Sequence, residues 1–179
     1  MLPRTVSVLR QVPFSAARNG VTYLAIQPVS WSEPTILERR YRPGVPPEEA
    51  VAEVADFLHD DYAYVFESYW DLWTPPQAAE KWILEPSLIR LTAHGAEFEE
   101  GAAEEIGHIQ IDFGLDTSFL HEEVELTGEA ERNVRSNVQK LVEFTAQVEK
   151  NAGATGRLLW SESEENLAQK LINRLQKVQ

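Results

Sequence analysis

The stretch from residue 62 to residue 73, YAYVFESYWDLW, constrains the fold more than any other part of the chain. It holds six aromatic side chains in twelve positions. Tyr62, Tyr64, Phe66 and Trp70 share the same parity, and alternate residues of a β-strand point to the same face. Because an α-helix would scatter these rings around its axis, the pattern predicts a strand with one aromatic, buried face.

Further strands are predicted on both sides of this segment. Residues 4–14 and 21–29 are rich in β-branched and aromatic residues, and Asn19-Gly20 between them is typical of a hairpin turn. The chain is therefore expected to open with a β-hairpin. Residues 35–41 fit either a strand or a short helix. The remaining expected elements are a short helix at 77–83 and strands at 87–94 and 106–113, with a little more strand possible at 96–99.

Two kinds of helix signal complete the pattern. Prolines at 46 and 47, followed by two glutamates, predict an internal helix over roughly 47–60. From Gly128 to Asn151 an apolar stripe has helical spacing; it consists of Val134, Val138, Leu141, Val142, Thr145 and Val148. A short strand at 156–160 and a last helix, opened by a Ser-Glu capping pattern at 161–164, are expected to follow. The sequence thus predicts one α+β domain over residues 1–179, in which a mostly antiparallel sheet packs against two C-terminal helices and the internal helix.

The charge is concentrated in one part of the chain. The formal net charge is −13, and residues 44–125 carry twenty acidic side chains against two basic ones. Such a block repels phosphate backbones and anionic membrane surfaces, so no nucleic acid and no membrane is expected as a partner. It attracts a basic protein, mainly by speeding the encounter. With no cysteine, no long apolar run and no signal-peptide pattern in the chain, we expect a cytoplasmic protein.

The first candidate site lies on the strand of residues 62–73. Glu67, Tyr69 and Asp71 fall on the face opposite the aromatic row, and Trp73 stands at the start of a proline-containing loop. An aromatic side chain among acids is typical of an anchor in a protein interface. These four residues are therefore the predicted contact site for a basic partner, although packing in the core is the commoner role for such aromatics.

The second candidate site is a polar face shared by two strands. If 87–94 and 106–113 pair antiparallel, Arg90 and His94 lie on the same face as His108 and Asp112, with Thr92 and Gln110 among them. Two histidines, an aspartate and an arginine are able to hold a metal or a small anion. The commoner explanation is the solvated face of a half-covered sheet. Two acidic runs with a histidine, at 59–61 and 121–123, fit helix ends better than metal sites.

The leading functional prediction is a non-catalytic acidic protein that binds a basic protein, for example an immunity or antitoxin protein that masks a cationic toxin. The alternative is a small-molecule or metal-dependent enzyme that uses the His94, His108, Asp112 and Arg90 face. The familiar nucleotide-binding and serine-hydrolase motifs do not occur in the sequence, and no cofactor is predicted. The sequence leaves open the identity of the partner or substrate and the oligomeric state.

Overall fold

The computed structural model describes residues 1–74, 81–114, 116–119, 128–154 and 156. The elements are α1 (Leu2–Leu9), β1 (Val21–Pro28), β2 (Leu37–Val45), α2 (Pro47–Ala52), η1 (Ala55–Phe57), β3 (Tyr62–Thr74), β4 (Ile83–His94), η2 (Phe98–Gly101), α3 (Ala103–Ile106), β5 (Ile109–Asp112), η3 (Asp116–Ser118) and α4 (Gly128–Asn151). The chain divides into two compact units. The first contains Met1–Asp71 and Pro86–Gly114, and the second contains Leu72–Glu85 and Leu115–Gln179.

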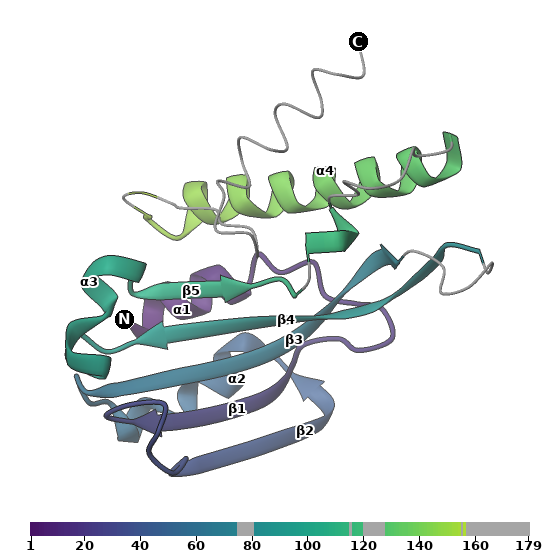
Figure 1. Ribbon diagram of the computed structural model, residues 1–179. Helices are drawn as coiled ribbons and strands as arrows, with labels where there is room; N and C mark the ends of the chain where they lie inside the picture. Colours follow the sequence, from purple (N-terminus) through teal and green to yellow (C-terminus); the bar gives the residue numbers. More distant parts are fainter. Residues whose placement is uncertain (75–80, 115, 120–127, 155, 157–179) are drawn as a thin grey trace. The chain divides into compact units, whose positions relative to one another are not determined.

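The described strands form one five-stranded sheet in the order β2-β1-β3-β4-β5 (Figure 1). The strand β1 pairs antiparallel with both β2 and β3, and β4 pairs antiparallel with β5. The α+β class and the antiparallel sheet that the sequence predicts are therefore confirmed. The aromatic segment is the middle strand β3, as its parity indicated, and the segment at 35–41 belongs to a strand, β2.

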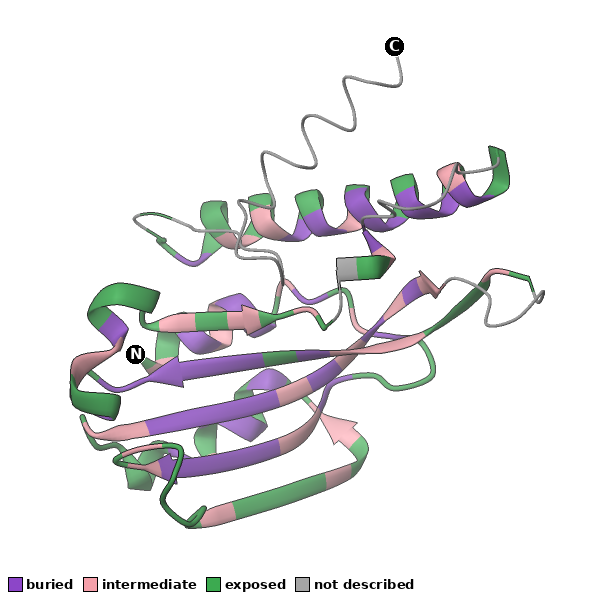
Figure 2. Cartoon of the chain, in the orientation of Figure 1, coloured by how far each residue is buried: buried purple, intermediate pink, exposed green. Residues whose placement is uncertain are grey.

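In the first unit, helices α1 and α2 cover one face of the sheet (Figure 1). The buried side chains of this face alternate along the central strands, and they include Leu24 and Ile26 on β1, Tyr64 and Phe66 on β3, and Ile89 and Leu91 on β4. From the helices, Val8, Leu9, Ala50, Val51 and Val54 are buried as well. Figure 2 shows the result: β1, β3 and β4 are largely buried along their middle parts, whereas β2 is mostly exposed. The opposite face of the same strands carries the candidate site.

The N-terminal hairpin prediction is wrong for its first strand. Residues 2–9 form helix α1, with a proline in its first turn. Thr5, Val8 and Leu9 are buried at helical spacing, so packing of one helix face prevails over the strand preference of the β-branched residues. The second predicted strand exists as β1, and Gly20 precedes it with a φ of 81°, a conformation that glycine adopts without strain.

The internal helix is shorter than the prediction. Helix α2 ends at Ala52, and only the 3-10 turn η1 continues toward residue 57. After Ala52 the chain carries Asp56, Asp60 and Asp61, and carboxylates are unfavourable at the negative C-terminal end of a helix. Leu58, which falls within the predicted helix, is consequently exposed. The short strand considered possible at 96–99 is also absent from this part of the structure, where η2 and α3 form instead, and β5 starts at Ile109 and not at residue 106.

The second unit is built around α4, whose predicted bounds are confirmed. Its buried row is Ala130, Asn133, Val134, Asn137, Val138, Leu141 and Phe144, whereas Val142 is exposed. The side chain of Asn137 pairs with the backbone of Trp73 in β3: Nδ2 donates to the Trp73 carbonyl at 2.7 Å, and Oδ1 accepts from the Trp73 N–H at 2.9 Å. Nδ2 also donates to the Ser118 carbonyl at 2.8 Å. The predicted helix at 77–83 falls largely outside the described residues, as do the strand at 156–160 and the last helix.

Candidate functional site

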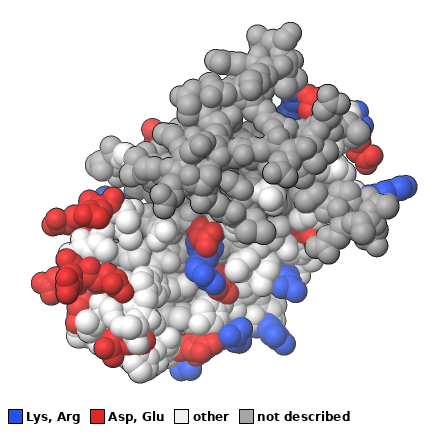
Figure 3. Space-filling model, viewed as in Figure 1, with Lys and Arg blue, Asp and Glu red and all other residues white. Residues whose placement is uncertain are grey.

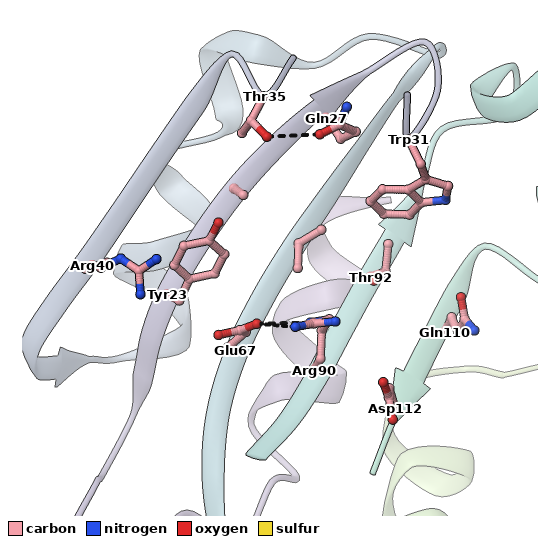
Figure 4. Close-up of a pocket in the computed structure, with 12 residues that line it drawn as sticks. Tyr23, Gln27, Trp31, Thr35, Arg40, Glu67, Arg90, Thr92, Gln110 and Asp112 are labelled. Atoms are coloured by element: carbon pink, nitrogen blue, oxygen red, sulfur yellow. Dashed lines mark hydrogen bonds and ion pairs between the residues drawn. The ribbon is translucent and has the colours of Figure 1, made fainter. Parts of the chain in front are cut away.

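The face of the sheet opposite α1 and α2 contains a hollow of about 600 Å³ within the first unit (Figure 4). Its lining residues come from all five strands and from the β1–β2 loop. Those with small side chains, Ala25, Val65 and Thr92, are buried and form the floor. Ala25 and Val65 face each other directly across β1 and β3. The hollow therefore exists because short side chains in the middle of the face are surrounded by long ones.

Charged side chains form one end of the hollow. Arg90 donates from Nε and Nη2 to one carboxylate oxygen of Glu67, at 3.0 and 2.7 Å. Glu67 is the less exposed member of this pair, so solvent screens the pair less than it does a typical surface ion pair. The guanidinium of Arg40 lies 5.0 Å from the ring centre of Tyr23, and burial raises the pKa of the Tyr23 hydroxyl, which keeps it a neutral donor. Asp112, also on the lining, faces Arg90 in the β4–β5 register.

The other end of the hollow is formed by the loop of residues 29–36 and by Trp31 (Figure 4). The side chain of Gln27 on β1 forms hydrogen bonds to three residues of this loop. Its amide nitrogen donates to the carbonyl oxygens of Ser30 and Glu33, and its amide oxygen accepts from the hydroxyl of Thr35. A buried side chain thus fixes both ends of the loop that carries Trp31.

Trp31 lies over two aromatic side chains of the sheet end. Its ring centre is 5.0 Å from that of Phe98 and 6.2 Å from that of His94, both in edge-to-face arrangements. His94 is 2% exposed, and neither of its ring nitrogens has a hydrogen-bond partner among the described residues. Burial lowers the pKa of His94, so the imidazole is neutral at pH 7.

The backbone at this end of the sheet adopts unusual conformations. Among the described residues other than glycine, only Val29, Glu99 and Glu100 have positive φ angles, of 57°, 51° and 56°. Val29 and Glu99 are linked, since the Glu99 N–H donates to the Val29 carbonyl at 2.9 Å. The Glu99 carboxylate accepts from the Trp31 N–H at 2.7 Å. Such strained residues persist only where their surroundings hold them, and they cluster at functional sites.

Acidic side chains crowd around the same end. Glu33, Glu97, Glu99, Glu100, Glu104 and Glu105 are all exposed. Figure 3 shows the acidic atoms gathered at the left, over α3 and the neighbouring loops, whereas basic atoms lie mostly toward the lower right. We refer to this group of six glutamates as the acidic end of the hollow. The first unit as a whole carries sixteen acidic and seven basic side chains.

The four residues of the predicted partner site all lie on β3 but make different contacts. Glu67 lines the hollow, whereas Tyr69 lies under the guanidinium of Arg18, at 4.4 Å from its ring centre. The Asp71 carboxylate accepts from the Ala16 N–H at 3.2 Å. The backbone of Trp73 is paired with Asn137 in the second unit. Of the four, only Glu67 therefore belongs to the hollow.

The predicted metal or ligand face is also divided. Arg90 and Asp112 line the hollow together with Thr92 and Gln110, which agrees with the expected antiparallel pairing. His94 is buried beneath Trp31, and His108 is exposed at the start of β5, where its carbonyl accepts from the His94 N–H at 2.8 Å. Among the described residues, no group of three or more histidine, aspartate and glutamate side chains is arranged to hold a metal ion.

Sequence reasoning did not find Trp31, Tyr23, Gln27 or the small floor residues. Trp31 belongs to a turn-rich segment, so neither a helical nor a strand pattern of apolar residues includes it. Strand parity in 21–29 was a usable signal, because Tyr23, Ala25 and Gln27 alternate with Leu24 and Ile26. Applying the alternation to β1 as well as to β4 and β5 would have identified a second polar row, on the face of β1 that points away from the core.

No family model, curated protein or solved structure matches this chain. Among the residues that the structure describes, no helix combines the length and the apolar character needed to cross a bilayer. The residues of the hollow therefore carry the functional argument by themselves.

Proposed function

We propose that this protein is a non-catalytic binding protein and that a basic segment of a protein partner binds in the hollow on the open face of the sheet. The observation that carries the proposal is the hollow itself, with a floor of small residues, an exposed tryptophan at one end and glutamates around that end. A small acidic protein that masks a basic toxin is the concrete case that its size and charge suggest.

The charge of the site supports a basic ligand. Inside the hollow, Arg90 is neutralised by Glu67, and Arg40 is neutralised by Glu38, whose carboxylate lies 2.9 Å from its guanidinium. Asp112 then adds a negative charge to the lining, and the six glutamates of the acidic end, which lie outside the lining, add negative charge near Trp31. A cationic side chain entering at the Trp31 end is attracted, and an anionic one is repelled.

The size and chemistry of the hollow also suit a peptide. A volume of about 600 Å³ is within the range of ligand sites. The lining offers amide, hydroxyl and aromatic groups from several strands, which are the groups that protein interfaces use for adaptable contacts. Both arginines of the lining are already paired with a carboxylate, Arg40 with Glu38 and Arg90 with Glu67, and this pairing disfavours a phosphate-rich ligand.

We propose to test this function by phage display, in which short random peptides are selected for binding to the protein. The wild-type protein serves as the target, and peptides that also bind the variant Ala25→Trp are removed, because this substitution fills the floor of the hollow. Ala52→Trp is the matched control, since Ala52 is exposed on α2, a helix that covers the other face. Far-UV circular dichroism checks that both variants fold.

We expect the surviving peptides to be rich in arginine and lysine and to bind Ala52→Trp as they bind the wild type. Their affinity should fall as salt rises from about 50 mM to about 500 mM, because the acidic end is exposed to solvent. Asp112→Asn, a mild change on the same lining, should weaken them too. Surviving peptides without a basic excess, or a selection in which no peptide distinguishes Ala25→Trp from Ala52→Trp, would refute the proposal.

A further inference from the structure

Trp31 combines wide exposure with a rigid position. Its side chain is 51% exposed, yet its ring rests edge-to-face on Phe98 and His94. Its backbone N–H donates to the Glu99 carboxylate. The two ring contacts and the backbone hydrogen bond together define the position of this exposed indole.

The contacts around Trp31 also determine which partners its ring accepts. Phe98 and His94 meet it from the sheet side, so the outer part of the indole remains open toward the hollow and the solvent. Because Gln27 and Glu99 already fix the loop, little conformational entropy remains to be lost when a ligand packs against the ring. Tryptophan is among the residues that are enriched at hot spots in protein interfaces.

We infer that Trp31 is the anchor of this binding site and that it stacks against an arginine side chain of the partner. This inference rests on the proposed function and adds the residue that provides specificity. The face of an indole attracts cations more strongly than any other side-chain ring does. A guanidinium is flat and weakly hydrated, so it stacks on the ring while its N–H groups reach the carboxylates of the acidic end. The compact, strongly hydrated ammonium of lysine fits this arrangement less well.

The buried His94 is consistent with a cationic ligand. It lies directly beneath the indole, and a positive charge there would oppose a second one above the ring. The His94 ring instead lies 5.7 Å from the Phe98 ring between centroids, and burial, the largest cause of its lowered pKa, favours the neutral form. In the described part of the chain, Trp31 thus has carboxylates around it and a neutral imidazole, that of His94, beneath it.

The test uses the most strongly enriched hollow-dependent peptide from the selection above, made synthetically with a fluorescent label. Its arginines are replaced one at a time by lysine and by citrulline, which keeps the shape of arginine but carries no charge. Each peptide is titrated by fluorescence polarisation against the wild type, Trp31→Leu, Trp31→Phe and Ile36→Leu. Ile36 is the matched control, because it lies on the same loop, is 48% exposed and does not line the hollow.

We expect Trp31→Leu to weaken binding about tenfold or more, Trp31→Phe to weaken it less, and Ile36→Leu to change it less than about twofold. For one arginine of the peptide, replacement by citrulline should weaken binding to the wild-type protein by a similar factor, and replacement by lysine should weaken it less. The same citrulline peptide should bind Trp31→Leu almost as well as the unmodified peptide binds Trp31→Leu. Equal binding to the wild type and Trp31→Leu, or a citrulline effect that is unchanged in Trp31→Leu, would overturn this inference and leave the proposed function standing. A selection that yields no hollow-dependent basic peptide overturns both.

Discussion

Asn137 offers a sharp test of how the second unit is held together. Its side chain is 1% exposed and makes three hydrogen bonds, two to the backbone of Trp73 and one to the carbonyl of Ser118. The substitution Asn137→Ala removes all three and leaves two carbonyls and one N–H without these partners. At a net value of about 1 kcal/mol for each bond, the free energy of unfolding should fall by about 3 kcal/mol.

Urea denaturation followed by far-UV circular dichroism measures this loss. With an m-value of about 2 kcal/mol per molar, the midpoint should move down by about 1.5 M. Asn137→Asp should be at least as destabilising. It keeps one acceptor for the Trp73 N–H, but it loses both donors and places a carboxylate against two carbonyl oxygens.

Asn133 is the matched control, one helical turn earlier on the same buried row. It is 9% exposed, and its Nδ2 has no hydrogen-bond partner in the described part of the chain. Asn133→Ala should therefore cost less than about 1 kcal/mol, because no orphaned partner remains. If Asn137→Ala and Asn133→Ala lose the same stability, or if Asn137→Ala stays within about 0.5 kcal/mol of the wild type, the bonding to Trp73 is not what stabilises this unit.

Two further predictions concern the first unit. The lowered pKa of His94 means that the unfolded chain binds a proton more readily than the folded one, so stability should fall as the pH drops below about 6.5, with a slope of at most about 1.4 kcal/mol per pH unit. His94→Leu should flatten this slope in urea titrations between pH 5 and pH 7, and an unchanged slope would contradict the assignment. Phe66→Ala should cost about 3–5 kcal/mol, whereas Val65→Ala, on the hollow side, should cost about 1.5 kcal/mol at most. Equal losses for these two would mean that the hollow face is packed like the core.

The sequence was most informative where one pattern persisted over many residues. The parity of aromatic residues in β3 and the long apolar spacing of α4 each identify an element and its buried side. The segment at 2–9 shows the opposite situation. Its β-branched residues favour a strand, and its helical spacing covers too few turns to prevail without knowledge of the sheet against which Thr5, Val8 and Leu9 pack.

The candidate site could be predicted only in part, because it depends on which strands are neighbours. The pairing of Arg90 with Asp112 follows from two adjacent strands of opposite direction, and the sequence indicated it. The sequence could not bring Trp31 to the same hollow, since that requires the β2-β1-β3-β4-β5 order and the loop conformation that Gln27 fixes. The exposed aromatic near the acids was expected at Tyr69 and Trp73. Parity identified the face of the strand, but it could not show that Arg18 lies over the Tyr69 ring or that Asn137 binds the backbone of Trp73.

The pairing of Asn137 with Trp73 also covers part of a strand edge. Strand β1 accompanies β3 only as far as Ser68, and from there on the long strand has lost a neighbour. Phe14 forms an isolated bridge with Trp70, and at Trp73 the asparagine of α4 occupies both backbone groups, as a paired strand would. An unpaired strand edge is a template for another chain. The Asn137 side chain therefore covers this edge at Trp73, and its removal would leave two backbone groups of β3 free to pair with a strand of another chain.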